Sequence, residues 1–215
     1  MGRVEYNDDD ADMLLARELQ LEEEREMLRQ HTQAGPEPRR PSNAAIATAD
    51  IVDETKLAFH LLRTRGLHES VNRGCLRLWD IVQAPQKLDF ALISNYMIDL
   101  SWLTSAMPGI LRCPKVAVIH GDGGIGYRPR NFVFHKPELS EAYGTMHTKM
   151  FILGYPKGIR VCVSTANLID PDYNDKSQVT WVQDFPWKKD VEAAPESSPF
   201  EEDLMSYMNA IGWKA

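Results

Sequence analysis

The sequence predicts an α/β fold in which a mixed sheet is flanked by helices on both faces. Two apolar runs, at residues 88–97 and 115–120, have the continuous hydrophobicity of buried strands. A third segment, residues 142–169, contains two β-rich runs separated by a turn in which proline presets φ and glycine ends the turn. Helical segments lie between and after these runs, and this alternation is typical of α/β proteins.

The first 32 residues predict an acidic helical tail that lies outside the core. Leu14, Leu21 and Leu28 recur every seven residues, and this apolar stripe is narrow for a helix packed inside a domain. Residues 8–24 loosely resemble a ubiquitin-interacting motif, which makes ubiquitin a candidate partner. A solvated or coiled-coil helix is the alternative, because acidic helices are common.

The rest of the chain divides into a linker and one domain. Residues 33–54 have the proline and polar content of a linker, whereas residues 55–215 are long and apolar enough to form a core. The elements expected in order are an irregular entry segment at 57–67, a helix at 76–82, a strand at 88–97, a helix at 99–106, a strand at 115–120, the hairpin, a polar loop at 170–175, a strand at 179–183, an acidic loop at 190–198 and a helix at 200–210 capped by Ser197 or Ser198.

The charge of the chain is unevenly distributed. The formal net charge is −7, which alone argues against binding to nucleic acid. Residues 1–40 carry 6 basic and 11 acidic groups, and residues 190–203 carry 6 acidic groups and no basic ones. Residues 41–189 carry 17 basic and 14 acidic groups, so the expected domain is mildly basic between two acidic segments. This distribution leaves a nucleic-acid partner open.

Cysteine usage and hydropathy indicate a protein that works inside the cell. Cys75, Cys113 and Cys162 lack metal-ligand spacing, and their odd number predicts free thiols in a reducing compartment. The polar N-terminus lacks a secretory core, and no apolar run is long enough to cross a bilayer. We therefore expect no membrane partner and no metal site.

The candidate catalytic residues lie within residues 142–169, whose two β-rich runs and turn predict a β-hairpin. Side chains alternate along a strand, so His147 and Lys149 share one face if this stretch is extended, and Asn167 is expected to arrive beside them. A neutral imidazole can attack phosphorus, while lysine and asparagine donors stabilise the non-bridging oxygens of the transition state. The alternative is a surface His-x-Lys on an ordinary hairpin, because short motifs often match by chance.

Larger blocks around this motif resemble the tyrosyl-DNA phosphodiesterase 1 family, a branch of the phospholipase D superfamily. The blocks are HTKMFILGY with RVCVSTANLI, NYMIDLSWL and VIHGD upstream, and the region around residues 176–181 downstream. Together they extend over most of residues 55–213 and are more specific than one motif. The resemblance implies a domain equivalent to one half of a phospholipase-D-like pseudo-dimer.

The resemblance also implies roles for five residues. His147 matches the nucleophile that forms a covalent phosphohistidine with the 3′ end of DNA, and Lys149 and Asn167 match the groups that hold the phosphate. Gln178 matches a residue that orients an active-site histidine, and Tyr143 matches an aromatic position on which a DNA base stacks. The implied function is hydrolysis of protein or peptide adducts at DNA 3′ ends during DNA repair in the nucleus, with no cofactor and no metal.

The chain also departs from the family pattern. The family enzymes carry a second His-x-Lys half that supplies the general acid, and this sequence contains one such motif. Met146 replaces a histidine often found beside the nucleophile. We therefore expect an enzyme that is incomplete unless a second half or self-association supplies the missing group. The alternative is a non-catalytic fragment or paralogue that acts as a DNA- or ubiquitin-binding module.

Overall fold

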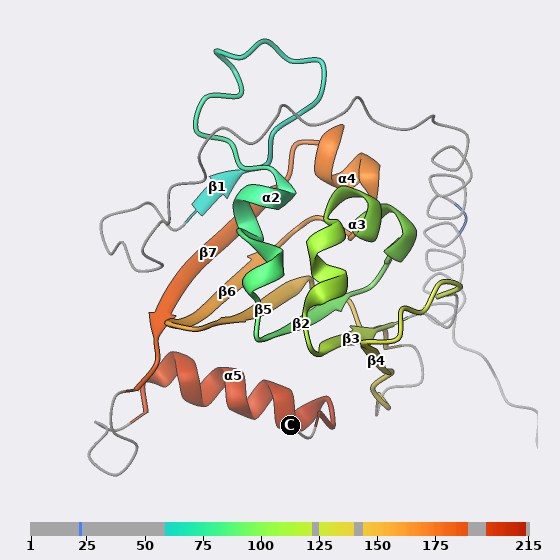
Figure 1. Cartoon of the computed structure of the whole chain (residues 1–215), viewed down its shortest axis with the longest axis vertical. Coiled ribbons are helices and arrows are strands. Elements are labelled where there is room, and N and C mark those ends of the chain that lie inside the picture. The colour runs from blue at the N-terminus through green and yellow to red at the C-terminus, as the bar shows by residue number, and fades with distance from the viewer. Residues whose placement is uncertain (1–21, 23–58, 122–124, 140–143, 189–196, 214–215) are drawn as a thin grey trace, which may run out of the picture. The chain divides into compact units, whose positions relative to one another are not determined.

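The computed structural model of the chain describes residues 22, 59–121, 125–139, 144–188 and 197–213. Among these residues, seven strands form one mixed sheet in the order β1-β7-β6-β5-β2-β3-β4 (Figure 1). The strands are β1 (Phe59–Leu61), β2 (Phe90–Asn95), β3 (Val116–His120), β4 (Phe132–His135), β5 (Met150–Tyr155), β6 (Gly158–Ser164) and β7 (Val179–Pro186). β2, β3 and β4 run parallel to one another, while the other neighbouring pairs are antiparallel.

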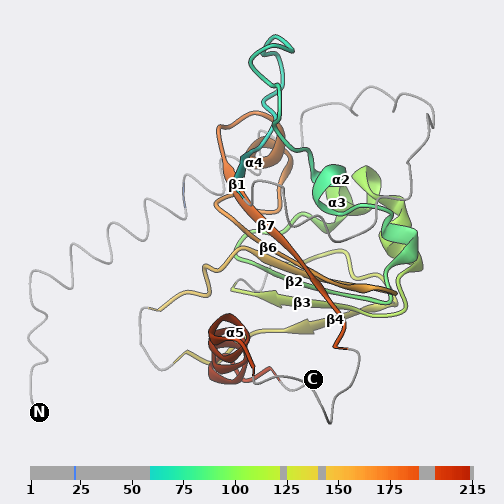
Figure 2. The same ribbon diagram turned by 90° about the vertical axis from the view of Figure 1, so that its left-hand side faces the viewer.

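Helices cover both faces of this sheet. The helical elements are α2 (Leu78–Ile81), α3 (Leu100–Ala106), α4 (Asp170–Asn174) and α5 (Pro199–Ala210), with 3-10 turns η1 (Pro85–Lys87) and η2 (Pro108–Arg112). Figure 2 shows α5 on one side of the sheet and α2 and α3 on the other. The predicted mixed α/β sheet with helices on both faces is confirmed.

A separate hydrophobic cluster lies on each face of the sheet. The larger one joins α2, α3 and η2 to the buried side chains of β2, β3 and β5, including Ile93, Val118 and Leu153. The smaller one joins Met208 of α5 to alternate positions of the same strands, such as Leu92 and Ala117. Because neighbouring residues of β2 and β3 face opposite clusters, both strands are buried on both sides, which explains their continuous hydrophobicity.

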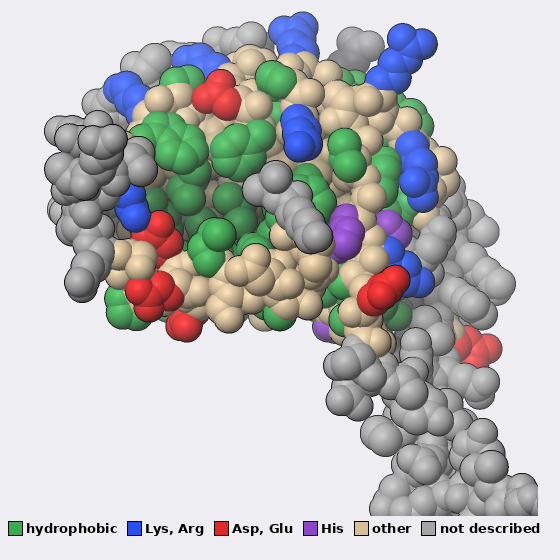
Figure 3. Space-filling view, turned by 90° about the horizontal axis from the view of Figure 1, so that it is seen from below, with side chains coloured by type: hydrophobic (Ala, Val, Ile, Leu, Met, Phe, Trp, Pro, Cys, Tyr) green, Lys and Arg blue, Asp and Glu red, His purple; other side chains and the backbone are tan. Residues whose placement is uncertain are grey.

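The lower end of the sheet remains partly open beside α5. Here the ring of Phe200 in α5 stacks on Phe185 of β7 at a centroid distance of 5.4 Å. Phe200 and Trp187 are nevertheless 39% and 45% exposed. Seen from below, hydrophobic side chains gather in a hollow, and the histidines visible in this view lie to one side of it (Figure 3).

Two local predictions were wrong. Residues 59–61 of the expected irregular segment form β1, whose strand conformation comes from pairing with β7 and not from any local pattern. The expected polar loop at 170–175 contains α4, which starts at Asp170 with a proline in its first turn. Arg65 Nη2 donates to Asp170 Oδ2 at 2.5 Å and ties this short helix to the segment after β1. Both elements thus depend on contacts that are distant in sequence.

The predictions for the C-terminal helix and the cysteines can be compared with the structure, whereas those for three other segments cannot. The helix expected at 200–210 is confirmed, and Ser198 caps it by accepting a hydrogen bond from the Glu201 N–H at 3.2 Å. The three cysteines, all within the described ranges, are free. The tail at 1–32 (apart from residue 22), the linker at 33–54 and most of the acidic loop at 190–198 lie outside the described residues.

Candidate active site

The candidate residues lie at the end of the sheet where β2 and β3 finish. β5 is antiparallel to β2, and its first residue, Met150, pairs with Ser94 near the carboxyl end of β2. β6 is antiparallel to β5, so Ser164, the last residue of β6, lies at the same end of the sheet as Met150. Ligands of open α/β sheets bind at the carboxyl ends of parallel strands. The sheet topology therefore brings segments 144–149 and 165–169 to the end of the sheet at which ligands of α/β proteins bind.

The segment before β5 packs tightly against the segment after β3. A Cβ atom added at Gly121 would lie 2.7 Å from the carbonyl oxygen of Met146 and 2.8 Å from Cδ2 of Tyr96. Only glycine permits this close approach of backbone to backbone. The VIHGD block thus has a structural use, because its glycine lets the chain around His147 lie against Tyr96.

His147 and Lys149 are in direct contact. They precede the strand rather than belonging to it, since β5 begins at Met150. Lys149 Nζ nevertheless lies 3.0 Å from His147 Nδ1 and donates to the His147 carbonyl oxygen at 3.1 Å. His147 is exposed, whereas Lys149 is only 7% exposed. The ring of Tyr96 supports the imidazole at a centroid distance of 4.9 Å.

The environment of His147 favours its neutral form. Partial burial of the ring, and then the positive charge of Lys149, lower the pKa of His147 below its usual value of 6.5. A neutral imidazole at physiological pH is the form that can act as a nucleophile. The same shift affects stability, because below pH 6.5 the unfolded chain binds this proton more readily than the folded one. Its contribution to stability is therefore present above pH 6.5 and is lost as the pH falls through the lowered pKa.

Asn167 is held at the same edge by its backbone neighbours. Asn95 Nδ2 donates to the carbonyl oxygen of Ala166 at 3.3 Å. The N–H of Leu168 donates to the carbonyl oxygen of Met97 at 2.9 Å. Residues 95 and 97 flank Tyr96, whose ring contacts His147. The segment that carries Asn167 therefore runs alongside the segment that supports the imidazole.

The side-chain oxygen of Asn167, Oδ1, is buried and has no hydrogen-bond partner within the described ranges. An unsatisfied buried polar atom costs about 1–3 kcal/mol, and such atoms are exceptional in native structures. The backbone is fixed separately, since the Asn167 N–H donates to Asp172 Oδ2 at 2.8 Å. Asp172 also pairs with Lys176 at 2.8 Å, so α4 anchors this position.

Gln178 and Tyr143 complete the predicted set. The side-chain oxygen of Gln178 accepts a hydrogen bond from Thr165 Oγ1, which places it against the loop that leads to Asn167. Tyr143 lies outside the described residues. The sequence reasoning gave no role to Tyr96 or Asp172, although Tyr96 stands within the quoted NYMIDLSWL block. The position of Tyr96 directly after an apolar run was an available signal, whereas Asp172 gave none because its segment has the composition of a polar loop.

The described residues contain neither a cluster of potential metal ligands nor a helix that could span a membrane. There, no group of three or more His, Cys, Asp or Glu side chains is arranged to hold a metal ion. None of the helices in these ranges is long and apolar enough to span a bilayer.

Comparison with known proteins identifies relatives of most of this chain. The family model described as tyrosyl-DNA phosphodiesterase matches residues 58–215. Tyrosyl-DNA phosphodiesterase 1 of Arabidopsis thaliana is 44% identical over 161 residues, which are 72% of this chain and 26% of that protein. The Drosophila melanogaster protein of the same name is 32% identical over 126 residues, 53% of this chain and 22% of that protein. The chain thus spans about a quarter of the length of these curated relatives.

The fold comparison agrees. The crystal structure of the yeast tyrosyl-DNA phosphodiesterase aligns with 72% of this chain and 38% of its own at a TM-score of 0.58 and 16% identity. At that identity the likeness shows the fold, and it covers little more than a third of the yeast chain. With the family match over residues 58–215 and the identity to the plant protein, the conclusion is that this chain belongs to the tyrosyl-DNA phosphodiesterase family.

Proposed function

We propose that this chain provides the nucleophilic half of a phosphodiesterase that removes protein or peptide adducts from the 3′ ends of DNA. The observation that carries the proposal is the 3.0 Å contact between His147 Nδ1 and Lys149 Nζ at the end of the sheet where β2 and β3 finish, in a chain of this family. The family name denotes hydrolysis of a bond between tyrosine and DNA. DNA 3′ ends are the partner that follows, and the nucleus is the matching location.

The proposed reaction has two steps. A nitrogen of His147 attacks the phosphorus at the DNA 3′ end, a P–N bond forms, and the bond from phosphorus to the adduct oxygen breaks. That oxygen leaves with the bonding electron pair and takes up a proton. Water then attacks phosphorus, loses a proton, and breaks the P–N bond to leave a DNA 3′-phosphate and free histidine. Lys149 and Asn167 supply donors to the non-bridging oxygens in both steps.

The Lys149 contact determines which ring nitrogen of His147 carries the hydrogen. An ammonium group can only donate, so the contact makes Nδ1 of His147 the acceptor and places the ring hydrogen of the neutral form on Nε2. Attack through Nε2 requires that hydrogen to be on Nδ1 instead. A bound phosphate would draw the ammonium of Lys149 towards its oxygens and release Nδ1. Substrate binding and activation of His147 are thereby coupled in this proposal.

The two proton transfers need a further group. While His147 is covalently attached to phosphorus, it cannot also protonate the leaving oxygen or deprotonate the attacking water. His120 ends β3 near this edge, but it is only 5% exposed and its ring packs edge-on against Phe134. We therefore assign the general acid to a group supplied by a second catalytic half or a second copy of the chain.

A substrate that needs no general acid tests His147 directly. We expect an oligonucleotide with a 3′-(p-nitrophenyl phosphate) group to release one equivalent of nitrophenolate per chain in a single burst, because this leaving group departs without a proton. Mass spectrometry of the acid-free quenched protein should then find the DNA 3′-phosphate attached to the peptide that contains His147.

Matched variants decide the assignment. His147→Ala should abolish both the burst and the adduct, and Lys149→Ala should slow the burst by about 10²–10³-fold, as loss of one charge-stabilising donor does. His60→Ala is the control, since this histidine lies on β1, which two strands, β7 and β6, separate from β5 in the sheet. A burst of normal size from His147→Ala, or its loss in His60→Ala, would refute the role given to His147.

A further inference from the structure

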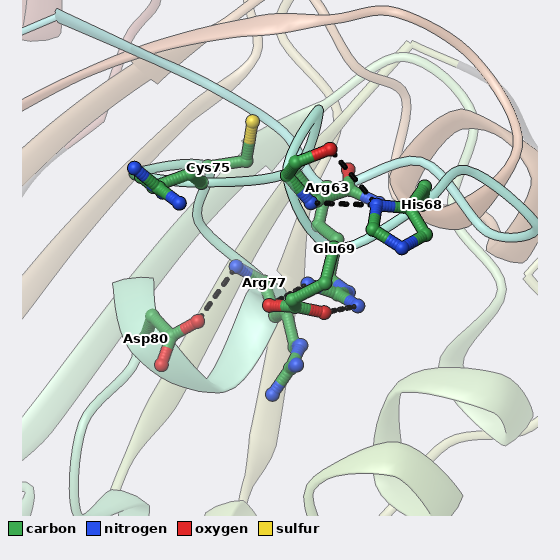
Figure 4. Close-up of a pocket in the computed structure, with 10 residues that line it drawn as sticks. Arg63, His68, Glu69, Cys75, Arg77 and Asp80 are labelled. Carbon is green, nitrogen blue, oxygen red and sulfur yellow. Dashed lines mark hydrogen bonds and ion pairs between the residues drawn. The ribbon is translucent and has the colours of Figure 1, made fainter.

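A pocket separate from the candidate active site lies in the segment that joins β1 to α2. It has a volume of about 490 Å³ and is lined by ten residues between positions 63 and 80 (Figure 4). This volume is within the range of about 300–1,000 Å³ that is usual for ligand sites. The family resemblance gave no role to any of these residues, and the pocket therefore needs an explanation of its own.

The pocket is built on a fixed scaffold. Asn72 is only 4% exposed, and its Nδ2 donates to the carbonyl oxygens of Thr64 and Leu67 at 2.9 and 3.2 Å. Its Oδ1 accepts from the Thr64 N–H at 2.9 Å, so one buried amide closes the loop. Gly74 has a φ of +78°, a conformation that favours glycine, where the chain turns back towards α2. The shape of the pocket is thus set before any ligand enters.

The pocket has an excess of positive charge. Three arginines face two carboxylates in its lining. Glu69 is occupied by Arg63, which it meets through both oxygens at 3.0 and 2.5 Å. Asp80 is occupied by the start of α2, because its Oδ2 accepts from the N–H of Arg77 at 2.8 Å. The hydrogen bonds of the two carboxylates thus go to Arg63 and to a backbone N–H, and within the described ranges none goes to the guanidinium of Arg77 or of Arg73.

The two remaining guanidinium groups are available for an anion. Arg77 lies over the ring of Trp79 at 4.9 Å, and Figure 4 shows its side chain extending away from Asp80. Such a stack fixes the orientation of the guanidinium without using its N–H donors. The Arg73 side chain has no ion pair or hydrogen bond with any residue in the described ranges. Two planar groups of donors are thus unpaired at one pocket.

His68 adds a neutral donor to the same pocket. Its Nδ1 accepts from the backbone N–H of Ser70 at 3.2 Å and lies 2.8 Å from Ser70 Oγ. Because a backbone amide can only donate, Nδ1 is the acceptor and the hydrogen of the neutral ring is on Nε2. The lining of the pocket therefore includes, besides the two arginines, an imidazole whose Nε2 carries the hydrogen of the neutral ring.

We propose that this pocket binds a phosphate group, held by Arg73 and Arg77 and by the Nε2–H of His68. Planar guanidinium groups match the oxygens of phosphate in pairs, which a single ammonium does not. A nucleic-acid strand is the favoured source of the phosphate. Arg65, in the same segment, pairs with Asp170 and Asp175 at 2.5 and 3.0 Å, and α4 follows Asn167 closely. The pocket and the candidate active site therefore share one end of the sheet.

The first test asks whether the pocket binds phosphate at all. Titration with inorganic phosphate should change the emission of Trp79 in a saturable way, because binding at Arg77 alters the group stacked on this indole. The change should disappear in the Arg73→Ala/Arg77→Ala double variant and in Trp79→Phe, but persist in Arg112→Ala, which removes an exposed arginine of η2. Glu69→Gln should bind phosphate more tightly, since it weakens the hold on Arg63. A wild-type response that the double variant retains would overturn the proposal.

The second test separates a strand from free phosphate. Only this choice of source rests on the proposed function. Fluorescence anisotropy of a labelled single-stranded DNA gives the slope of log K against log salt concentration, and each neutralised phosphate of a single strand contributes about 0.7 to it. The double variant removes the contact with one phosphate and should therefore lower the slope by about 0.7, whereas Arg112→Ala should leave it unchanged. An unchanged slope beside a positive phosphate titration would refute the strand as the source. A lowered slope without a nitrophenolate burst would instead refute the proposed function and leave the pocket standing.

Discussion

The ion pair between Arg160 and Asp184 should be one of the largest single contributions to the stability of the sheet. The two residues face each other across β6 and β7, and their side chains are only 9% and 16% exposed. The guanidinium meets both carboxylate oxygens at 2.6 and 2.8 Å. Asp184→Ala removes one partner and leaves a buried, permanently charged group without its counter-ion.

The size of the loss follows from what Arg160 retains. Breaking a buried ion pair by removing one partner costs about 3–5 kcal/mol. Arg160 Nη1 still donates to the carbonyl oxygens of Ile81 and Asp80 at 3.0 and 3.4 Å, so the lower end of this range, about 3 kcal/mol, is expected. For a domain of this size the midpoint of thermal unfolding should fall by about 6–12 °C.

Urea unfolding followed by circular dichroism measures this difference, and a double variant provides the control. Replacing both partners by apolar residues, as in Arg160→Met/Asp184→Leu, should recover most of the lost stability, because no buried charge remains. A loss of less than about 1 kcal/mol in Asp184→Ala would refute the reasoning, since it would mean that the guanidinium is solvated in the folded protein.

Three further predictions concern single residues. Lys149→Met should raise the pKa of His147 towards 6.5, as measured by an NMR titration of the ring, because it removes the nearby positive charge; an unchanged pKa would show that burial alone causes the shift. Gly154→Ala should destabilise the sheet by about 1–3 kcal/mol in urea unfolding, since the added Cβ would lie 2.2 Å from Cε1 of Phe90, and a neutral effect would mean that the phenyl ring moves aside. Ser198→Ala should cost about 1 kcal/mol by removing the helix cap, whereas Ser198→Asp should keep it, and equal losses in calorimetry would contradict the capping role.

The parts of the fold that the sequence predicts are those with a pattern of their own. The apolar runs before Asn95 and His120 predict β2 and β3 because burial on both faces requires uninterrupted hydrophobic residues. β1 and α4 carry no such pattern. β1 is a strand only because β7 pairs with it, and α4 is a helix in a polar segment that Arg65 holds in place. Local propensity cannot indicate either element when a distant contact decides the conformation.

The candidate site also has a part that the sequence predicts and a part that it does not. Strand alternation predicts that His147 and Lys149 lie together, and they do so although the strand starts only at Met150. The support of the imidazole by Tyr96 was not predictable, because it depends on the close approach at Gly121. The pocket lined by Arg73 and Arg77 also gave no signal, since spacing in sequence does not show which guanidinium groups find carboxylates.

The short pairing of β1 has a consequence for handling the protein. β1 covers only the first three residues of β7, and the side chains of Phe59 and Leu61 on it are 68% and 55% exposed. Within the described ranges, residues 182–186 of β7 have no strand on their outer side, and this edge is protected at its end by Pro186, which lacks an N–H. A version shortened to begin after Leu61 would bare the whole eight-residue edge. Such an edge invites pairing with another molecule, and we expect this shortened protein to precipitate during purification.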